Sequence, residues 1–384
     1  MTDKIPEGWR ECKLGDYAQV NMGQSPKSKF YNNLGNGIPF LQGNRTFGKR
    51  FPTISTYCTN PKKIANKGDI LFSVRAPVGE INIANQQICI GRGLSSLSSK
   101  SGDNIFLFYL LHFIKDKVLI SESGTVFGSI NKSDLENVDV LLPPLSEQRA
   151  IASVLGSLDD KIDLLHNENH TLEQLAETIF RQWFIEEVDD SWEEVPLGNS
   201  NLATIISSGI NYFEGEKTYL ATGDVDNTEV KGETSITFEN RPSRANMEPV
   251  VNSVWFAKKG GVRKLLMFTD YSQNLHNLIL STGFTGLKTT ALSHYYVWCY
   301  IMSTEFQEIR DSFVSGTVQP DINNDSLNQI MIPKPDDTTL LRFNEIVKPF
   351  FIKISFNQVQ IRTLENLRDT LLPKLMSGEV RVEI

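Results

Sequence analysis

Several features that mark other classes of protein are scarce or missing in this sequence. The four cysteines form no Cys-x-x-Cys pair and are scattered at Cys12, Cys58, Cys89 and Cys299. Neither a disulfide framework nor a zinc site is therefore expected. No run of about 18 apolar residues occurs, so a membrane-spanning helix is not expected either, and residues 1–6 lack the apolar core of a secretory signal. A reducing cytoplasm is the expected compartment.

The signature motifs of common enzyme classes are missing as well. There is no P-loop, no Gly-x-Gly-x-x-Gly after a predicted strand and no Gly-x-Ser-x-Gly elbow. His166 and His170 have zinc-like spacing on a predicted helix, but no third ligand is evident, and two exposed histidines are the simpler interpretation. Asp159 and Asp160 lie on the same helix, where a solvated charged face is expected rather than a nuclease site. The sequence predicts no catalytic residue and no metal site.

Charge is distributed unevenly along the chain. The net charge is −8, yet residues 1–143 carry 17 Lys and Arg against 12 Asp and Glu. Residues 144–190 carry 3 against 11, residues 191–335 carry 11 against 16, and residues 336–384 balance at 7 against 7. Nucleic-acid contact depends on where positive charge is concentrated. The first segment could hold DNA by its own field, whereas the acidic segment 144–190 is expected to face solvent or a basic partner.

The chain repeats its own order of features. The pattern Trp-x4-Leu-Gly begins at Trp9 and again at Trp192, and a segment that starts with Gly-Thr-Val and ends with Ile-Asn occurs at 124–131 and at 316–323. An apolar strand ending in prolines follows each copy, and a long helical segment follows the prolines. This order predicts a tandem duplication. Its four segments are globular at 1–143 and 189–336 and helical at 144–188 and 337–384.

The helical segments carry the strongest periodicity. Apolar residues recur in alternating steps of four and three from Ile151 to Trp183 and from Phe343 to Leu375, which is typical of a coiled-coil seam. A duplicated unit closes most simply around a pseudo-twofold axis, so the helices are expected to pair antiparallel. The residues predicted to pair are Leu158, Ile162, Leu165, Asn169, Leu172, Ile354, Asn357, Ile361 and Leu364.

Two details of these helices follow from the sequence. Centring the seams on each other places Asn169 opposite Asn357, where a buried pair would fix the register at some cost in stability. Alternatively, both asparagines lie at the seam edge and meet water. Ser146, after the prolines, is expected to cap the first helix, and Ser377-Gly378 is expected to end the second.

The globular segments are predicted to be mixed α/β. Residues 68–74 look like a turn entering a strand, residues 104–118 like an amphipathic helix, and residues 31–37 like a loop. The expected fold class is α+β, with two mixed α/β domains in a pseudo-twofold tandem repeat, separated by two long antiparallel coiled-coil helices.

The junctions between prolines and helices carry a family resemblance. Leu-Leu-Pro-Pro-Leu-Ser-Glu-Gln-Arg-Ala-Ile-Ala at 141–152, Leu-Asp-Asp-Lys-Ile at 158–162 and the stretch 364–379 strongly resemble the central and C-terminal regions of the specificity (S) subunit, HsdS, of type I restriction–modification enzymes. The resemblance covers the whole chain. It implies that each globular domain is a target-recognition domain that reads one half of a split, asymmetric DNA target.

The resemblance also implies a set of partners. The helices would act as a ruler for the unread spacer and dock two methyltransferase (M) subunits, and restriction (R) subunits would join that complex. S-adenosylmethionine, ATP and Mg²⁺ would be bound by the partners, so no cofactor is expected in this chain.

Readout of double-stranded DNA needs side chains with paired donors or acceptors on loops of little bulk. The predicted DNA-binding residues are Gln24, Ser25, Lys27, Gln42, Asn44, Arg45, Arg75, Arg92, Thr125, Ser208, Thr222, Asp224, Lys258, Lys259, Arg263, Lys264 and Thr317. Lys27, Lys29, Lys49 and Arg50 are expected to contact phosphates rather than bases. For any one of these residues the alternative is an ordinary exposed loop position. Tyr212 and Phe213 are expected in the core.

The repeat is imperfect in two places. Glu147-Gln148-Arg149 has no counterpart near Thr338, so the two M-docking surfaces need not be equivalent. Arg368 occupies a seam position, where it would reach solvent or meet a partner's carboxylate.

Two other functions stay open, namely a nuclease or methyltransferase with a cryptic site and a coiled-coil scaffold whose globular ends bind protein. The acidic second domain is expected to depend on basic M subunits for DNA affinity.

Overall fold

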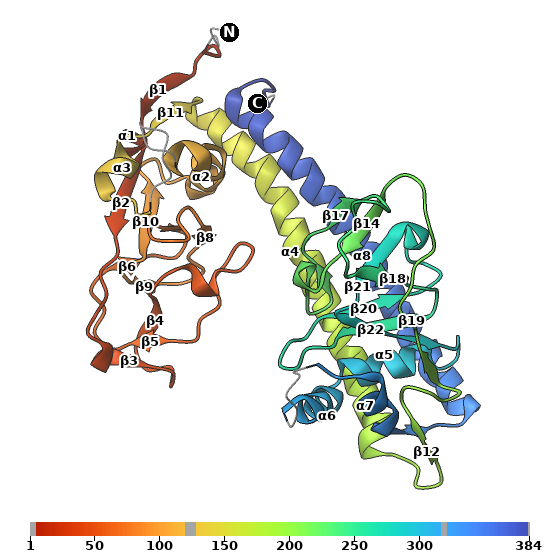
Figure 1. The fold of residues 1–384 in the computed structure, drawn as a ribbon. Coiled ribbons are helices and arrows are strands. Elements are labelled where there is room, and N and C mark those ends of the chain that lie inside the picture. The colour runs from red at the N-terminus through yellow and green to blue at the C-terminus, as the bar shows by residue number, and fades with distance from the viewer. Residues whose placement is uncertain (1–4, 120–127, 316–320, 383–384) are drawn as a thin grey trace. The chain divides into compact units, whose positions relative to one another are not determined.

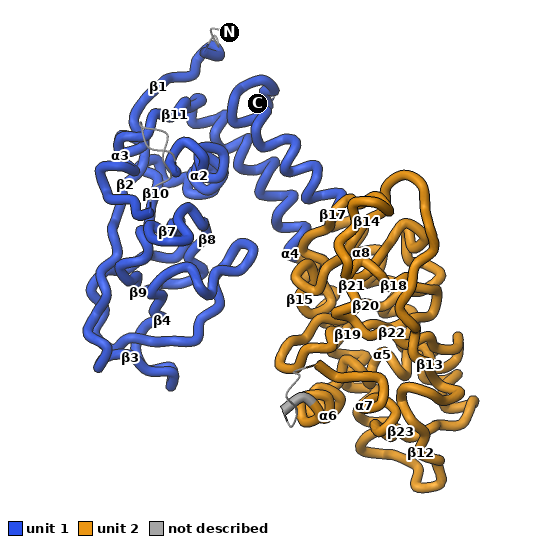
Figure 2. The backbone as a smooth tube through the Cα atoms, viewed as in Figure 1, with its two compact units in different colours: residues 1–163, 362–384 blue, residues 164–361 orange. Residues whose placement is uncertain are grey.

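The structure, a computed structural model, describes residues 5–119, 128–315 and 321–382 (Figure 1). The chain forms two compact units, of which unit 1 contains residues 1–163 and 362–384 and unit 2 contains residues 164–361 (Figure 2). Both long helices, α4 (Leu145–Arg181) and α8 (Asp337–Ser377), contribute to both units. Each unit is thus a globular domain with its own share of the two helices.

The described residues of unit 1 form three sheets and three helices besides the long ones. A two-stranded sheet pairs β1 (Arg10–Lys13) with β11 (Asp139–Leu142). A four-stranded antiparallel sheet has the order β2 (Ala18–Met22), β10 (Leu94–Ser99), β7 (Ile70–Ser73) and β8 (Ile81–Ile83). A five-stranded sheet has the order β3 (Tyr31–Asn32), β5 (Tyr57–Cys58), β4 (Ile38–Leu41), β9 (Ile88–Ile90) and β6 (Ile64–Ala65). The helices are α1 (Leu14–Tyr17), α2 (Asn104–Leu119) and α3 (Lys132–Glu136), with 3-10 turns η1 (Ser28–Phe30) and η2 (Asn44–Thr46).

Unit 2 repeats this plan. Its terminal pair is β12 (Glu193–Pro196) with β23 (Met331–Lys334), and its antiparallel sheet has the order β13 (Ala203–Ile205), β22 (Phe284–Thr289), β19 (Ser253–Ala257) and β20 (Leu265–Phe268). A second four-stranded sheet has the order β17 (Thr234–Ile236), β14 (Lys217–Leu220), β21 (Leu278–Ser281) and β18 (Ala245–Met247), and a small hairpin joins β15 (Val225–Asp226) to β16 (Glu229–Val230). The helices are α5 (His294–Met302), α6 (Thr304–Ser315) and α7 (Asn324–Gln329), with the π-helix η3 (Gln182–Glu186) and 3-10 turns η4 (Thr222–Asp224) and η5 (Leu275–Asn277).

The sheet topology supports the predicted duplication. In each unit a terminal strand pair stands beside an antiparallel four-stranded sheet. The neighbouring sheet contains one parallel pair, β4 with β9 in unit 1 and β14 with β21 in unit 2. The fold is therefore α+β, with two mixed α/β domains in tandem and two long helices, as the sequence predicts.

One hydrophobic core in each unit joins the globular domain to the long helices. In unit 1, α2 packs Phe106 and Leu110 into the same core as Ile151 of α4 and Leu375 of α8. In unit 2, α5 is buried along its whole length, because its sequence is apolar or aromatic on nearly every side. Burial of these faces holds the helix ends against the domains.

The helix ends differ in part from expectation. The first long helix begins at Leu145, so Ser146 lies inside its first turn and is not the N-cap. The second ends at Ser377, as predicted, and Gly378 follows with φ +76°, the left-handed conformation that glycine adopts without strain. Pro349 and Pro373 both lie within α8.

The long helices pair antiparallel within each unit. In unit 2, Asn357 Nδ2 donates to Asn169 Oδ1 at 2.8 Å, and both side chains are buried. In unit 1, Arg368 Nη1 lies 2.8 Å from Asp159 Oδ1. From the Asp159 contact to the Asn169 contact the residue numbers rise along α4 and fall along α8, so the helices are antiparallel, and the asparagine pair has the register that the centred seams predict.

Candidate nucleic-acid interface

The predicted base-reading residues of unit 1 meet at one corner. Gln24 and Ser25 follow β2, Gln42 follows β4, and Arg92 lies in the turn between β9 and β10. Ser25 Oγ accepts hydrogen bonds from Gln42 Nε2 at 2.8 Å and from the backbone N of Arg92 at 3.2 Å. Three loops far apart in the sequence thus bring four of the predicted residues together.

Close backbone approach at this corner requires glycine. A Cβ on Gly91 would lie 2.8 Å from Gln42 Oε1, and a Cβ on Gly93 would lie 2.7 Å from Gln42 O. Contacts this short do not occur for real side chains, so the turn passes Gln42 only because both positions lack one. Arg92 is consequently the only side chain of this Gly-Arg-Gly stretch, and it is exposed.

Arg75 extends this corner. It follows β7 and forms an antiparallel bridge with Ser129, while the preceding residue, Val74, donates its N–H to Gly93 O at 2.9 Å. A shallow pocket of about 270 Å³ is lined by Met22, Val74, Arg75, Arg92, Ser129, Ile130 and Asn131. Two guanidinium groups beside one pocket can bind phosphate or the acceptor edge of guanine.

The repeated Ile-Asn motif has a structural role. Ile130 and Ile322 are buried. Asn131 and Asn323 cap α3 and α7, and their side chains accept hydrogen bonds from the backbone N–H three residues later, at 3.1 and 2.9 Å. The motif thus anchors the segment that pairs with the basic residue after β7 or β19 in each unit.

Lys259 in unit 2 is structurally equivalent to Arg75 in unit 1. It follows β19, the equivalent of β7, and forms an antiparallel bridge with Asp321, just before the capping Asn323. Both basic side chains are exposed. The equivalence of Arg75 and Lys259 becomes visible only through these bridges, because the intervening stretches differ in length.

The hairpin between β19 and β20 of unit 2 carries basic residues at 258–264, and one of these cations binds within the unit. Lys264 Nζ donates to the backbone carbonyls of Thr222 at 2.6 Å and Val225 at 2.7 Å. Its ammonium group therefore ties this hairpin to the neighbouring turn. Arg263 is exposed and Lys258 half-buried.

Sequence reasoning missed two residues that hold this hairpin. The Arg310 side chain on α6 is buried and donates from Nη1 to Val262 O at 3.0 Å. Asp311 Oδ1 accepts from Arg310 Nε at 3.0 Å and from the Gly261 N–H at 3.1 Å. An arginine on an amphipathic helix gave no sequence signal for this role, since such residues usually face solvent.

The remaining predicted DNA-binding residues differ in their exposure and contacts. Lys27, Arg45 and Ser208 are exposed, and Asn44 is half-buried with Nδ2 3.4 Å from Pro77 O. Asp224 Oδ2 accepts the Ala221 N–H at 2.8 Å, which closes the η4 turn. Thr125 and Thr317 lie outside the described residues, as do both Gly-Thr-Val stretches.

Four expectations about individual side chains are wrong. Tyr212 is 65% exposed rather than part of the core, although its ring lies 5.0 Å from that of Phe238. Asp159 is buried instead of solvated, because Tyr109 Oη and Arg368 Nη1 both donate to it. Arg368 accordingly meets a carboxylate of its own unit. His166 is half-buried, with Nδ1 2.8 Å from Glu229 Oε1, whereas His170 is exposed.

The motif at the start of α4 points largely inward. Glu147 Oε2 accepts from Trp9 Nε1 at 3.1 Å and from Arg381 Nη2 at 2.6 Å. Gln148 Oε1 accepts from Tyr17 Oη at 3.1 Å. These bonds use the polar groups of two buried side chains to hold the helix start against unit 1. Of the Glu-Gln-Arg triplet, only Arg149 is exposed.

Within the described ranges, no group of three or more His, Cys, Asp or Glu side chains could hold a metal ion. Among the helices of the same ranges, none is long and apolar enough to cross a membrane.

This chain is similar to known proteins in both sequence and fold. The family model "Type I restriction modification DNA specificity domain" matches residues 6–174. The putative MjaX specificity subunit of Methanocaldococcus jannaschii is 45% identical over 180 residues, which span 46% of this chain but only 42% of that relative. The MjaIX specificity subunit of the same organism is 28% identical over an alignment that covers 99% of this chain and 95% of the relative.

A solved structure extends the likeness in fold to the whole chain. The S subunit of a type I restriction–modification system from M. genitalium has a TM-score of 0.59 at 16% identity, covering 98% of this chain and 97% of that one. The chain is therefore similar to type I specificity subunits, through a domain model at residues 6–174 and a relative aligned along nearly all of both chains, and it shares the fold of the solved S subunit.

Proposed function

We propose that this chain recognises double-stranded DNA as the non-catalytic specificity subunit of a type I restriction–modification complex. The observation that carries the proposal is the exposed cation at the same place in both domains, Arg75 after β7 and Lys259 after β19. In unit 1 this cation lines one pocket with Arg92, whose backbone N–H donates to Ser25 beside Gln42, and these side chains can offer paired donors and acceptors to base edges. Each domain reads one half of a split target, and the halves differ because the side chains around the two cations differ.

The helices serve as spacer and as docking surface for two M subunits, and R subunits join the complex. The acidic segment 144–190 suits a basic surface on these partners. S-adenosylmethionine, ATP and Mg²⁺ are bound by the partner subunits, which carry out adenine methylation and cleavage.

Co-expression with its cognate methyltransferase subunit, followed by genome-wide mapping of methylated adenines, tests this proposal. We expect one motif made of two unlike halves around an unread spacer, and no methyl transfer or cleavage by the purified chain alone. An undivided motif, or an assembled complex that methylates nothing, would contradict the proposal.

A further inference from the structure

A small hairpin in unit 1 lies between a predicted DNA-reading turn and the long helices. It follows η2, which carries Asn44 and Arg45. Phe47 bridges to Pro52, and the Thr53 N–H donates to Thr46 O at 2.8 Å. The base of the hairpin is thus continuous with the turn, and Lys49 and Arg50 stand at its tip.

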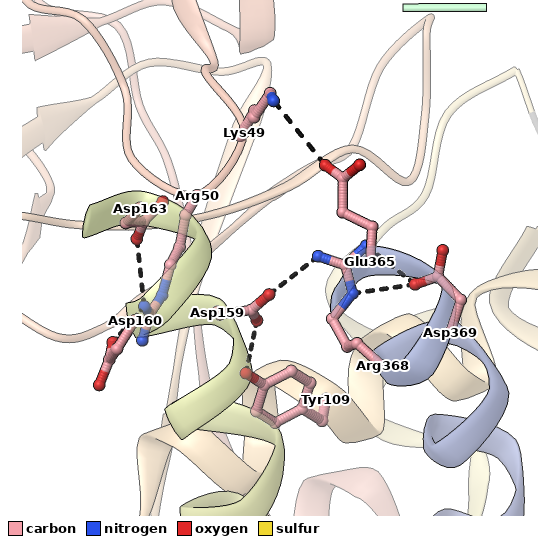
Figure 3. A network of polar contacts seen from close by, with 9 residues as sticks. All are labelled: Lys49, Arg50, Tyr109, Asp159, Asp160, Asp163, Glu365, Arg368 and Asp369. Atoms are coloured by element: carbon pink, nitrogen blue, oxygen red, sulfur yellow. Dashed lines mark hydrogen bonds and ion pairs between the residues drawn. The ribbon is translucent and has the colours of Figure 1, made fainter. Parts of the chain in front are cut away.

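The tip of this hairpin is bound to the helices by charge (Figure 3). Arg50 Nη1 lies 2.5 Å from Asp160 Oδ1 and 3.2 Å from Asp163 Oδ2, both on α4. Lys49 Nζ lies 3.8 Å from Glu365 Oε1 on α8. The Arg50 side chain is only 12% exposed and Asp163 is 33% exposed, so this ion pair is partly shielded from solvent, whereas the Asp160 carboxylate is 72% exposed. Arg50, which is expected to contact phosphate, thus contacts two carboxylates of α4 in the described structure, and its phosphate contact stays a prediction.

The carboxylates around Arg50 keep it charged despite its burial. Burial alone would lower the pKa of Arg50, but the hydrogen bond and charge of Asp160 raise it above its ordinary value. Separating a half-buried charge from its carboxylate partners costs free energy. These ion pairs therefore fix the hairpin to α4.

Unit 2 contains the same hairpin, built with different chemistry. It follows η4 as the first follows η2, Val225 pairs with Val230, and the Lys231 N–H donates to Asp224 O at 2.7 Å. These contacts align residues 46–53 with residues 224–231 and place Thr228 at the position of Arg50. Thr222, a predicted DNA-reading residue, then aligns with Asn44.

The tip of the second hairpin also binds α4. Thr228 Oγ1 donates to Glu173 Oε1 at 2.7 Å, and Glu229 Oε1 lies 2.8 Å from His166 Nδ1. Burial raises the pKa of Glu173, while the hydrogen bond from Thr228 opposes that rise. A contact retained in both copies while its residues differ is explained better by a shared mechanical role than by a shared ligand.

We propose that Arg50 and Thr228 are positioning residues, which fix the DNA-reading turn of each domain to the long helix that sets the spacing between half-targets. This inference rests on the proposed function. Because a short turn reads a base only when its side chains are held to within a fraction of an ångström, a released hairpin loosens readout without removing a single DNA contact.

The test compares base discrimination by the co-expressed methyltransferase complex at each half of the target. Wild type, Arg50→Gln and Thr228→Val are assayed on the methylated site and on sites with one base changed in either half. We expect Arg50→Gln to reduce base discrimination on the order of tenfold in one half-target only, and Thr228→Val to reduce it by a similar factor in the other half. A factor of about ten is what one mismatched base pair normally costs in affinity.

Rescue and a matched control separate positioning from general damage. Arg50→Lys should recover part of the discrimination, and the swapped pair Arg50→Asp with Asp163→Arg should recover more than either change alone. Lys115→Gln removes a comparable ion pair of unit 1, Lys115 to Glu80 at 3.1 Å, away from the hairpin and should leave discrimination unchanged. If Arg50→Gln unfolds unit 1, Asp160→Asn at an exposed carboxylate gives the same readout.

Equal loss in both half-targets, or unchanged discrimination by folded variants, would overturn the inference. A wild-type complex without a split motif would instead refute the proposed function and is recognised before any variant is made.

Discussion

His294 shows how burial alone changes the chemistry of one side chain. It begins α5, is buried, and has Nδ1 2.8 Å from Thr289 Oγ1, while Nε2 has no hydrogen-bond partner within the described structure. Burial disfavours the charged imidazolium and lowers the pKa of His294 to about 4. The folded chain therefore holds this residue neutral at pH values where the unfolded chain protonates it.

The stability of unit 2 should fall in acid because of His294. The unfolded chain takes up the proton below about pH 6.5, whereas the folded chain does so only near pH 4, so stability is present above pH 6.5 and is lost as the pH falls through this window. Between pH 7.5 and 4.5 the wild type should lose roughly 2–3 kcal/mol more than His294→Gln in urea unfolding. Parallel pH profiles of the two proteins would contradict this expectation.

The paired helices illustrate how one polar contact specifies an element. Asn357 Nδ2 donates to Asn169 Oδ1 and to Glu168 Oε2, both at 2.8 Å. Glu168 in turn lies 3.4 Å from Lys353 Nζ. Shifting one helix against the other would bury these amides against apolar side chains, so the pair selects one register.

Single and double substitutions at this pair should therefore not be additive. Asn357→Leu leaves a buried acceptor unpaired and should destabilise unit 2 by about 1–3 kcal/mol. Adding Asn169→Leu removes that acceptor, so the double variant should be more stable than the single one. Urea unfolding of the wild type, both single variants and the double variant measures the coupling, and additive losses would show that the amides act independently.

Across the whole molecule, positive charge is concentrated in the first globular segment. Residues 1–143 have 17 Lys and Arg against 12 Asp and Glu, whereas residues 191–335 have 11 against 16. Arg75 and Lys259 therefore have different electrostatic surroundings. Arg75 lines a pocket together with Arg92, whereas the backbone bridge of Lys259 places it opposite the acidic residue Asp321. The first domain should provide most of the electrostatic attraction to DNA.

Salt dependence of DNA binding by the full chain tests this asymmetry. Arg75→Gln should weaken binding and reduce the slope of log affinity against log salt by about 1. Lys259→Gln should have a smaller effect on affinity, because the acidic field around it already weakens attraction. Lys67→Gln, an exposed lysine before the opposite end of β7, is the control, and a loss equal to that of Arg75→Gln would contradict a specific role for Arg75.

The sequence by itself determined the tandem order and the two long helices, and it predicted the register that places Asn169 opposite Asn357, whereas the pairing of the two amides came from the structure. The order, the helices and the register each depend on periodicity or on self-comparison along the chain, and periodic apolar faces have few ways to be buried. The end of α8 at Gly378 was predictable for a similar local reason. Pro349 and Pro373 lie within the predicted segment, and α8 continues through both.

Only the tertiary structure decided which polar side chains face inward. Arg50, Lys264, Asp159 and Glu147 have the sequence context of surface residues, yet each meets a partner far away in the chain. The equivalence of Arg75 with Lys259, and of the Arg50 hairpin with the Thr228 hairpin, likewise appears only in the strand pairing. Long-range pairing of charges leaves no periodic trace in a sequence, because its cost and gain depend on burial that the fold creates.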